Sequence, residues 1–234
     1  MVPKEADLVA CDHDFTKLSL TPSVIFICEV PFSIEESFYC GQVFVSYKDT
    51  TFQPSTAIRH TSEFFSAIST YYPQIFPPIL CIYTDGGPDH RVTYGSVQIS
   101  LICLFLRGDF DMLIALRTAP HQSWTNPAER IMSILNLALQ GVALMRESMS
   151  YDMEILFGKA STLEEIRNAA KNSPQLASEL QNSITLIQEL LITRTEGLCL
   201  HNENFICYSP AQESMITDFF NVSIQSVYLI SFLN

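Results

Sequence analysis

Two acidic residues that lie far apart in the sequence occupy positions where a metal-dependent site would need them. Asp85 follows the apolar run at 78–84 and precedes Gly86 and Gly87, so a strand would deliver it to a turn that a ligand can approach closely. Glu129 lies in the first turn of an expected long helix. A carboxylate at a strand end and another at a helix start are what a divalent-metal phosphoryl-transfer site requires.

Both acids also have simpler explanations. Asp-Gly-Gly-Pro at 85–88 is typical of a turn, although Asp89 and His90 add a second acid and a potential ligand or base. In the other segment, Asn126 is a good N-cap and Glu129 stands at the position that completes a capping box. A polar stripe on the same helix indicates a wet cleft or plain solvent exposure: Glu129, Ser133, Asn136 and Gln140.

Glu29 is the third candidate carboxylate. It stands near the end of the apolar run at 23–31, where a central strand would impose a large desolvation penalty on an unpaired acid. If this strand neighbours the one that ends at Asp85, the two carboxylates need a cation between them. A divalent metal would serve, and so would a salt-bridge network drawn from the nearby cations Arg91, Arg117 and Arg130.

The elements that must position these acids follow from the hydrophobic pattern. We expect strands at 23–31 and 41–49 joined as an antiparallel hairpin, a short third strand at 50–53, and strands at 78–84 and 111–117. Helices are expected at 61–72, at 92–107 as a buried helix, and for about twenty residues from Asn126. This order implies a mixed sheet with helices on both faces.

The chain divides into three regions by character. Residues 1–22 form a mixed N-terminal segment, residues 23–150 carry the alternating strands and helices, and residues 151–234 are mainly helical. Helices are expected there at 163–170 and 176–193. The apolar stretch at 218–234 indicates an element that needs a partner, or the exposed end of a truncated gene model.

Composition narrows the classes of function. The chain has 13 Lys and Arg residues against 25 Asp and Glu residues, a formal net charge of −12, which opposes unaided nucleic-acid binding. Seven cysteines without a C-x-x-C pair indicate reduced, intracellular thiols rather than a zinc site. The start lacks the pattern of a secretory signal, and no apolar run is long enough for a membrane span.

The motifs and their order resemble a known family. An acid on the first strand, TDGG after the fourth and S-x-x-NP-x-E after the fifth resemble the ribonuclease H-like core of transposases and integrases that carry an Asp-Asp-Glu triad. Residues 22–149 also look like transposon-derived eukaryotic proteins that share SFY-x-GQV, PS-x-x-x-RH, TDGGPDHR and NPAERIMSILN-type segments. The resemblance implies an α/β fold with a ribonuclease H-like mixed five-stranded sheet, helices on both faces and a helical C-terminal appendage.

The resemblance also implies a catalytic and metal-binding site. Its residues would be Glu29, Asp85 and Glu129, holding Mg²⁺ or Mn²⁺ for attack on a DNA phosphodiester. Glu29 stands where the family has Asp, and its longer side chain moves a bridging carboxylate by one methylene. Asp12 and Asp14 are the alternative acids, although they precede the strand.

Three functions therefore remain open. The first is a transposase-derived nuclease or strand-transfer domain, nuclear within the cell, that reaches DNA through a module absent from this chain. The second is a non-catalytic interaction protein on an inherited ribonuclease H-like scaffold, with its acids paired to Arg or capping the helix. The third is an unrelated metal-dependent phosphatase or hydrolase. The first predicts three converging carboxylates, whereas the second predicts salt bridges in place of an open acidic cleft.

Overall fold

The chain folds as a mixed α/β protein, as the hydrophobic pattern predicts. The computed structural model describes residues 18–33, 35–119, 122, 125–140 and 145–233, with the side chains of 224–233 left out. In chain order the elements are β1 (Leu20–Cys28), β2 (Gly41–Asp49), α2 (Ala57–Tyr71), β3 (Ile79–Thr84), α3 (Gly95–Gly108), β4 (Met112–Arg117), α4 (Pro127–Ala138), α5 (Tyr151–Lys159), α6 (Leu163–Asn172), α7 (Pro174–Ser183), α8 (Thr185–Glu196), β5 (Cys199–Leu200), β6 (Glu203–Asn204), β7 (Ile206–Cys207) and α9 (Glu213–Leu233).

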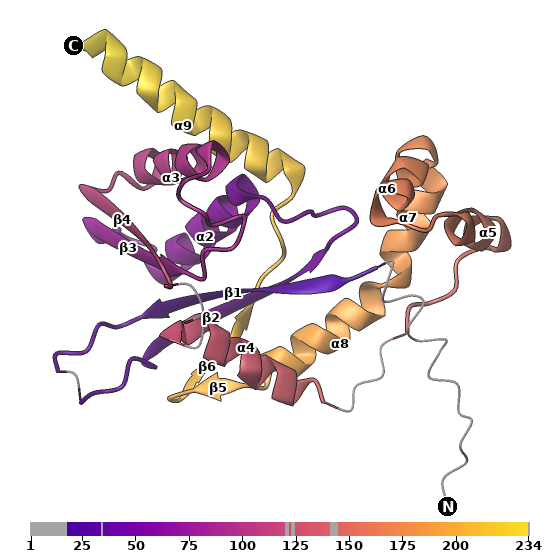
Figure 1. Cartoon of the computed structure of the whole chain (residues 1–234), viewed down its shortest axis with the longest axis horizontal. Helices are drawn as coiled ribbons and strands as arrows, with labels where there is room; N and C mark the ends of the chain where they lie inside the picture. The colour runs from indigo at the N-terminus through magenta and orange to yellow at the C-terminus, as the bar shows by residue number, and fades with distance from the viewer. Residues whose placement is uncertain (1–17, 34, 120–121, 123–124, 141–144, 234) are drawn as a thin grey trace, which may run out of the picture.

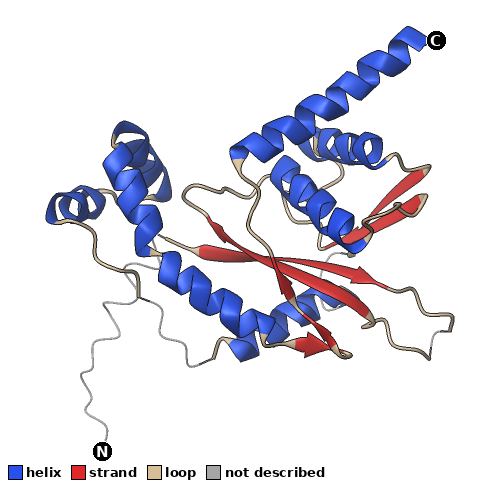
Figure 2. Cartoon of the chain, turned by 180° about the vertical axis from the view of Figure 1, so that it is seen from behind, coloured by secondary structure: helices blue, strands red, loops and turns tan. Residues whose placement is uncertain are grey.

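The described strands form three small sheets rather than the single five-stranded sheet that the resemblance implies. Strands β1, β2 and β7 make one sheet, β3 and β4 a second, and β5 and β6 a third. Figure 2 shows the β3–β4 pair standing apart from the long hairpin. The free edge of β2 is taken by β7, which pairs with it in parallel through Phe44 and Val45.

The expected third strand at 50–53 is a turn. The side chain of Asp49 accepts a hydrogen bond from the backbone N–H of Thr51 at 2.8 Å, and its carbonyl accepts one from Gln53 at 2.6 Å. Pro54 follows and offers no N–H to a ladder. The chain is thereby turned away from the sheet and into α2.

The predicted antiparallel hairpin of β1 and β2 is confirmed. Their register runs without a break from Leu20 opposite Asp49 to Cys28 opposite Gly41. Strand β2 is buried along almost its whole length, on both faces, which makes it the central element of the molecule. Gly41 has a φ of 138°, and a Cβ atom there would lie 2.0 Å from the carbonyl oxygen of Ile27.

Two helical layers cover opposite faces of this hairpin. Helices α4 and α8 lie on one side and α2, α3 and α9 on the other (Figure 1). The first layer shares a core with the strands: Val43, Val45, Tyr47, Ile131, Leu135, Leu191 and Phe205. The second layer packs on β3 and β4 through Ile68, Leu80, Cys103, Leu104, Phe110 and Phe219. Helices α5, α6 and α7 hold a third, separate cluster.

Several helices differ from the expected ranges. The helix at 92–107 was expected to be fully buried, but Ile99 and Ile102 of α3 are each more than half exposed. The segment at 176–193 is two helices, because α7 ends at Ser183 and Ile184 joins it to α8. Helix α4 ends at Ala138, so it has twelve residues rather than about twenty.

The conformation of Gly41 yields a prediction about stability. Gly41→Ala should lower the free energy of unfolding by at least about 2 kcal/mol, because the new Cβ meets a backbone oxygen and the φ suits only glycine. Gly158→Ala in α5, where a Cβ would meet nothing within 4 Å, should instead stabilise by about 0.5–1 kcal/mol. Urea unfolding of both variants checks the pair, and equal effects would contradict the prediction.

Candidate functional site

Asp85 lies where the sequence predicts, directly after β3. Its side chain is exposed, and its Oδ1 accepts a hydrogen bond from the backbone N–H of Gly87 at 2.9 Å. The side chain of Arg117 lies over Gly86, 3.3 Å from where a Cβ atom would stand. The acid therefore closes its own turn and still faces solvent.

Glu129 stands in the first turn of α4, as predicted, but the capping box is incomplete. The side chain of Asn126 accepts a hydrogen bond from the N–H of Ala128 at 3.1 Å. The carboxylate of Glu129 makes no hydrogen bond or ion pair with any described residue, and it is half-buried. Ser133, Asn136 and Gln140 of the polar stripe are exposed. Of the two explanations for the stripe, this fits plain solvent exposure rather than a wet cleft.

Glu29 lies one residue beyond the end of β1 and is exposed. Its N–H donates to the carbonyl of Cys40 at 2.9 Å, which continues the hairpin ladder. Burial raises the pKa of Tyr71 at the end of α2, and the charges of Tyr72 and Glu29 raise it further. Glu29 thus lies beside α2 in water, and the expected desolvation penalty at a central strand does not arise.

The three acids do not form a metal centre in this structure. Over the described parts of the chain, no three His, Cys, Asp or Glu side chains are grouped so that they could hold a metal ion. Glu29, Asp85 and Glu129 all fall within those parts, so the donor set that Mg²⁺ or Mn²⁺ would need is not assembled from them. The alternative acids Asp12 and Asp14 lie outside the described residues.

The arginines named as competing partners do not pair with these acids either. Arg91 lies over the ring of Tyr94 at 5.1 Å, and Arg130 lies over the ring of Tyr39 at 5.9 Å. Arg117 covers Gly86, as described above. Among the described residues, none of the three arginines makes an ion pair with Glu29, Asp85 or Glu129.

The charges that do gather form a buried network next to Asp85. Nζ of Lys48 on β2 lies 3.2 Å from Oε2 of Glu63 on α2, and each side chain is only 1% exposed. The same ammonium lies 3.0 Å from Nδ1 of His60. Because an ammonium can only donate, Nδ1 accepts from Lys48 and the ring proton sits on Nε2. Burial lowers the pKa of Lys48, and the Glu63 carboxylate opposes that shift.

The TDGGPDH loop packs on this network through its last two residues. Nε2 of His60 faces Oδ2 of Asp89 at 3.6 Å, and the rings of His60 and His90 lie 4.7 Å apart. Burial, with the charge of Lys48, lowers the pKa of His60 to about 3. Burial also lowers the pKa of His90, although the carboxylates of Asp85 and Asp89 raise it in part. Both imidazoles are therefore neutral at neutral pH.

Arg59 ties the start of α9 to the same helix. Its guanidinium is nearly fully buried and donates to the carbonyl of Ala211 and to the carboxylate of Glu213. The N–H of Ala211 donates in turn to Oε1 of Glu63 at 3.1 Å. The network thus joins β2, α2, the 85–90 loop and the segment that enters α9.

The geometry of this network fits structural support better than catalysis. Lys48 has a lowered pKa, but its side chain is sealed from solvent and already contacts Glu63 and His60. A nucleophile or base must come within about 3 Å of a substrate atom. No substrate can come that close to the Lys48 ammonium, because the side chain is sealed from solvent. The RH pair of the PS-x-x-x-RH segment supplies Arg59 and His60 to the network, and the sequence pattern alone assigns it no role.

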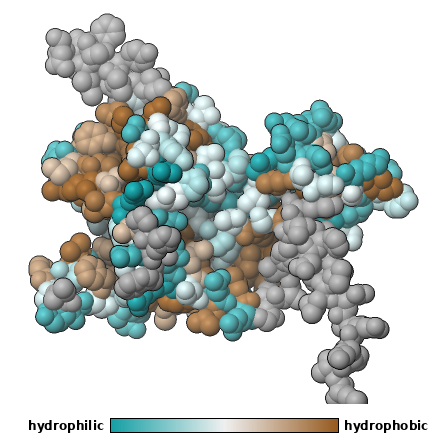
Figure 3. Space-filling view, in the orientation of Figure 1, coloured by the Kyte–Doolittle hydropathy of each residue, from teal (hydrophilic) through white to brown (hydrophobic). Residues whose placement is uncertain are grey.

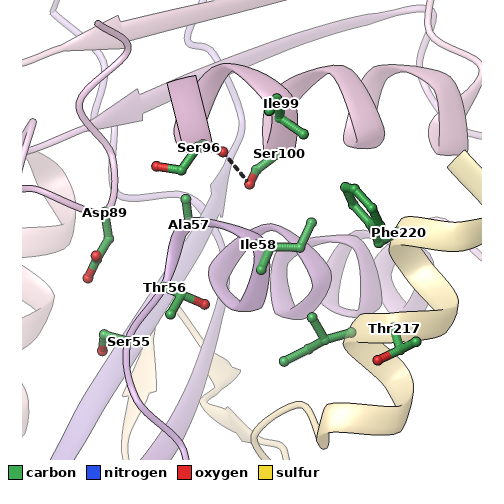
Figure 4. A pocket seen from close by; sticks show the side chains of 11 residues that line it. Ser55, Thr56, Ala57, Ile58, Asp89, Ser96, Ile99, Ser100, Thr217 and Phe220 are labelled. Carbon is green, nitrogen blue, oxygen red and sulfur yellow. Dashed lines mark hydrogen bonds between the residues drawn. The ribbon is translucent and has the colours of Figure 1, made fainter. Parts of the chain in front are cut away.

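An open cavity of about 550 Å³ lies on the far side of Asp89 (Figure 4). Its wall combines the hydroxyls of Thr56 and Thr217 with the ring of Phe220. The hydroxyl of Ser100 donates to the carbonyl of Ser96 at 2.7 Å. The cavity therefore presents one carboxylate and several hydroxyls beside an apolar floor.

Comparison of the chain with protein-family models, with curated proteins and with solved structures gave no match.

The depressed pKa of His60 predicts a pH dependence of stability. The unfolded chain binds a proton near pH 6.5 and the folded chain only near pH 3, so stability should fall as the pH drops from 6.5 towards 3. His60→Gln should flatten the dependence of the free energy of unfolding on pH in this range. The lost pH dependence is about 1.4 kcal/mol for each unit by which the folded and unfolded pKa values of His60 differ. His201→Asn at an exposed turn should leave the curve unchanged. Urea unfolding from pH 3 to pH 8 is the measurement, and a wild-type slope in His60→Gln would contradict it.

The buried ion pair predicts a large effect of removing one partner. Lys48→Met should cost about 3–5 kcal/mol, because it leaves the Glu63 carboxylate buried without a cation. Adding Glu63→Gln should restore part of that loss, since a neutral amide replaces the lone charge. Lys171→Met on the exposed end of α6 is the control and should change stability by less than about 0.5 kcal/mol. Thermal unfolding should separate the three, and a Lys48→Met variant as mild as the control would refute the assignment.

Proposed function

We propose that this chain is a non-catalytic interaction protein built on a scaffold of transposase ancestry. The observation that carries the proposal is the separation of the three candidate acids. Glu29 is exposed near Tyr71, Asp85 closes its own turn, and Glu129 makes no ion pair with any described residue. Nearby, Lys48 and Glu63 form a buried ion pair, although the pairing of the three acids with Arg that an interaction scaffold also predicted is not found among the described residues.

The order of the elements supports a ribonuclease H-like ancestry for the scaffold. An antiparallel hairpin comes first, then a helix, and then two parallel strands joined by a helix. Asp85-Gly86-Gly87 follows β3 and NPAE opens α4 after β4. The two motifs thus follow the third and fourth strands, one strand earlier than the resemblance implies, because the segment at 50–53 is a turn. The five-stranded sheet of that family remains part of the proposal.

Metal-dependent chemistry on DNA is the second candidate. Asp85 favours it, because an exposed acid at the carboxyl end of a parallel strand is where ligands gather in α/β sheets. Two-metal sites hold their ions about 4 Å apart between shared carboxylates, however, and Glu29, Asp85 and Glu129 do not form such a group in the described chain. The net charge of −12 also repels a polyanion.

Two further expectations bear on where such a protein acts. Among the described residues, the helices include none with the length and apolar character needed to cross a membrane. A nuclear site of action follows from the ancestry alone and stays a prediction.

The non-catalytic proposal is tested by titration with Mg²⁺ and Mn²⁺. We expect the melting temperatures of the wild type and of Asp85→Asn to respond equally, because no described acid cluster binds the ion in the folded state only. Asp152→Asn, which removes an exposed acid on α5, controls for the change in net charge. A melting temperature that rises in the wild type and not in Asp85→Asn would refute the proposal and restore the metal-dependent candidate.

A further inference from the structure

We propose that the outer face of the β3–β4 sheet binds an amphipathic helix of a partner protein, one whose apolar stripe is flanked by Lys or Arg. This inference rests on the proposed interaction function and names its surface and the chemistry of its partner. We call this surface the outer face. It consists of the side chains that alternate outward from the two strands: Ile79, Cys81, Tyr83, Met112, Ile114 and Leu116.

The outer face is apolar and open to solvent. Ile79 is 55% exposed, Met112 50% and Leu116 49%. The parallel register sets Ile79 beside Met112, Cys81 beside Ile114 and Tyr83 beside Leu116, so the six side chains form three adjacent pairs. Hydrophobic surface gathers over this part of the molecule in Figure 3. Contiguous exposed apolar patches rimmed by polar residues are typical of interaction sites.

Among the described elements, helices cover only the inner face of the same two strands. Leu80 is buried and packs with Ile82 and Leu113 against α2, α3 and α9. On the opposite side of the molecule, α4 and α8 cover β1 and β2. No described helix extends from there over the outer face of β3 and β4 (Figure 1). Parallel strands are ordinarily covered on both faces. The outer face of β3 and β4 is therefore not covered by a described helix.

The dimensions of the outer face suit one helix. Two strands about 4.8 Å apart, with their side chains, make a strip roughly as wide as a helix, whose diameter is about 10 Å. Six residues of strand span about 20 Å, which equals a helix of about 13 residues. A second sheet would need a wider platform, because sheets that pack face to face usually have more strands than two.

The charges at the ends of the strip indicate a basic partner. Asp109 and Asp111 precede β4, and Asp85 follows β3; all three are exposed. Arg117 is the cation at the carboxyl end of β4. The rim is therefore acidic at the amino end of β4, where Asp109 and Asp111 lie, while Arg117 balances Asp85 at the carboxyl end. The chain as a whole carries −12. Complementary charge favours a partner with Lys or Arg beside its apolar residues.

The same charges argue against a second copy of this chain as the occupant. Two copies that meet through this face would each carry −12, and copies whose strands run in the same direction would bring Asp109 and Asp111 of both chains together. Like charges placed opposite one another in an interface cost several kcal/mol. A basic helix removes that repulsion and covers the same apolar area.

The test uses the full chain and two synthetic probes. Both are 14-residue amphipathic helices with the same leucine stripe, one flanked by lysines and the other by glutamates. We expect the Lys-flanked peptide to bind in fluorescence anisotropy, and the Glu-flanked peptide to bind at least about tenfold more weakly. Added salt should weaken binding of the Lys-flanked peptide, because salt screens the exposed rim.

Variants locate the binding. Met112→Thr combined with Leu116→Thr should reduce affinity for the Lys-flanked peptide by about tenfold or more, since it removes apolar contact area. Both positions are exposed and threonine suits a strand, so the melting temperature should stay near the wild type. Leu186→Gln on α8, also exposed, should bind like the wild type. Asp111→Asn should weaken binding without touching the apolar strip, and it serves as the second variant if the double variant unfolds.

Equal binding of the two peptides, or wild-type affinity in both the double variant and Asp111→Asn, would overturn helix docking. So would a wild-type dimer in sedimentation that the double variant loses, because the occupant would then be a second copy. Metal-specific stabilisation through Asp85 would overturn the non-catalytic function instead and would leave these peptide results standing.

Discussion

The burial of Lys48 is the constraint on which the rest of the structure depends. Strand β2 is covered on both faces, and because residue 48 is a lysine, its ammonium lies in the interior. An isolated ammonium there would be costly, and it is tolerated because Glu63 and His60 on α2 face it at 3.2 and 3.0 Å. That requirement sets α2 against β2. It also sets the 85–90 loop against α2, since Asp89 and His90 close the network.

Local sequence patterns predicted most of the strands and helices. Tertiary packing and local side-chain contacts set the bounds and the exposure that these patterns did not predict. The β1–β2 hairpin, β3, β4 and the start of α4 follow from apolar runs, prolines and an N-cap. The third strand failed because Asp49 captures the N–H of Thr51 in a turn, a local contact that competes with any ladder. The division of 176–193 at Ile184 and the exposed Ile99 of α3 depend on neighbours that periodicity does not specify.

The candidate site shows the same division between motif and geometry. Sequence placed Asp85 after a strand and Glu129 in a first turn, because both positions depend on local signals. It could not say whether the acids meet, since that depends on how β1, β3 and α4 are set against one another. The network of Lys48, Glu63 and His60 went unnoticed for a related reason: a buried lysine on a strand looks like any solvated one until the second face of the sheet is known.

The contact between Glu63 and Ala211 has a consequence for how the protein is made. Glu63 accepts a hydrogen bond from Ala211, 148 positions later in the sequence. Arg59 donates a hydrogen bond to the carbonyl of the same residue. During synthesis, the 148 positions between Glu63 and Ala211 must be made before this contact can form. Until the segment with Ala211 docks, water can solvate the exposed polar groups of Arg59 and Glu63, and closure of such a long loop is slow. The contact between α2 and the segment that enters α9 is therefore among the last that the fold can complete.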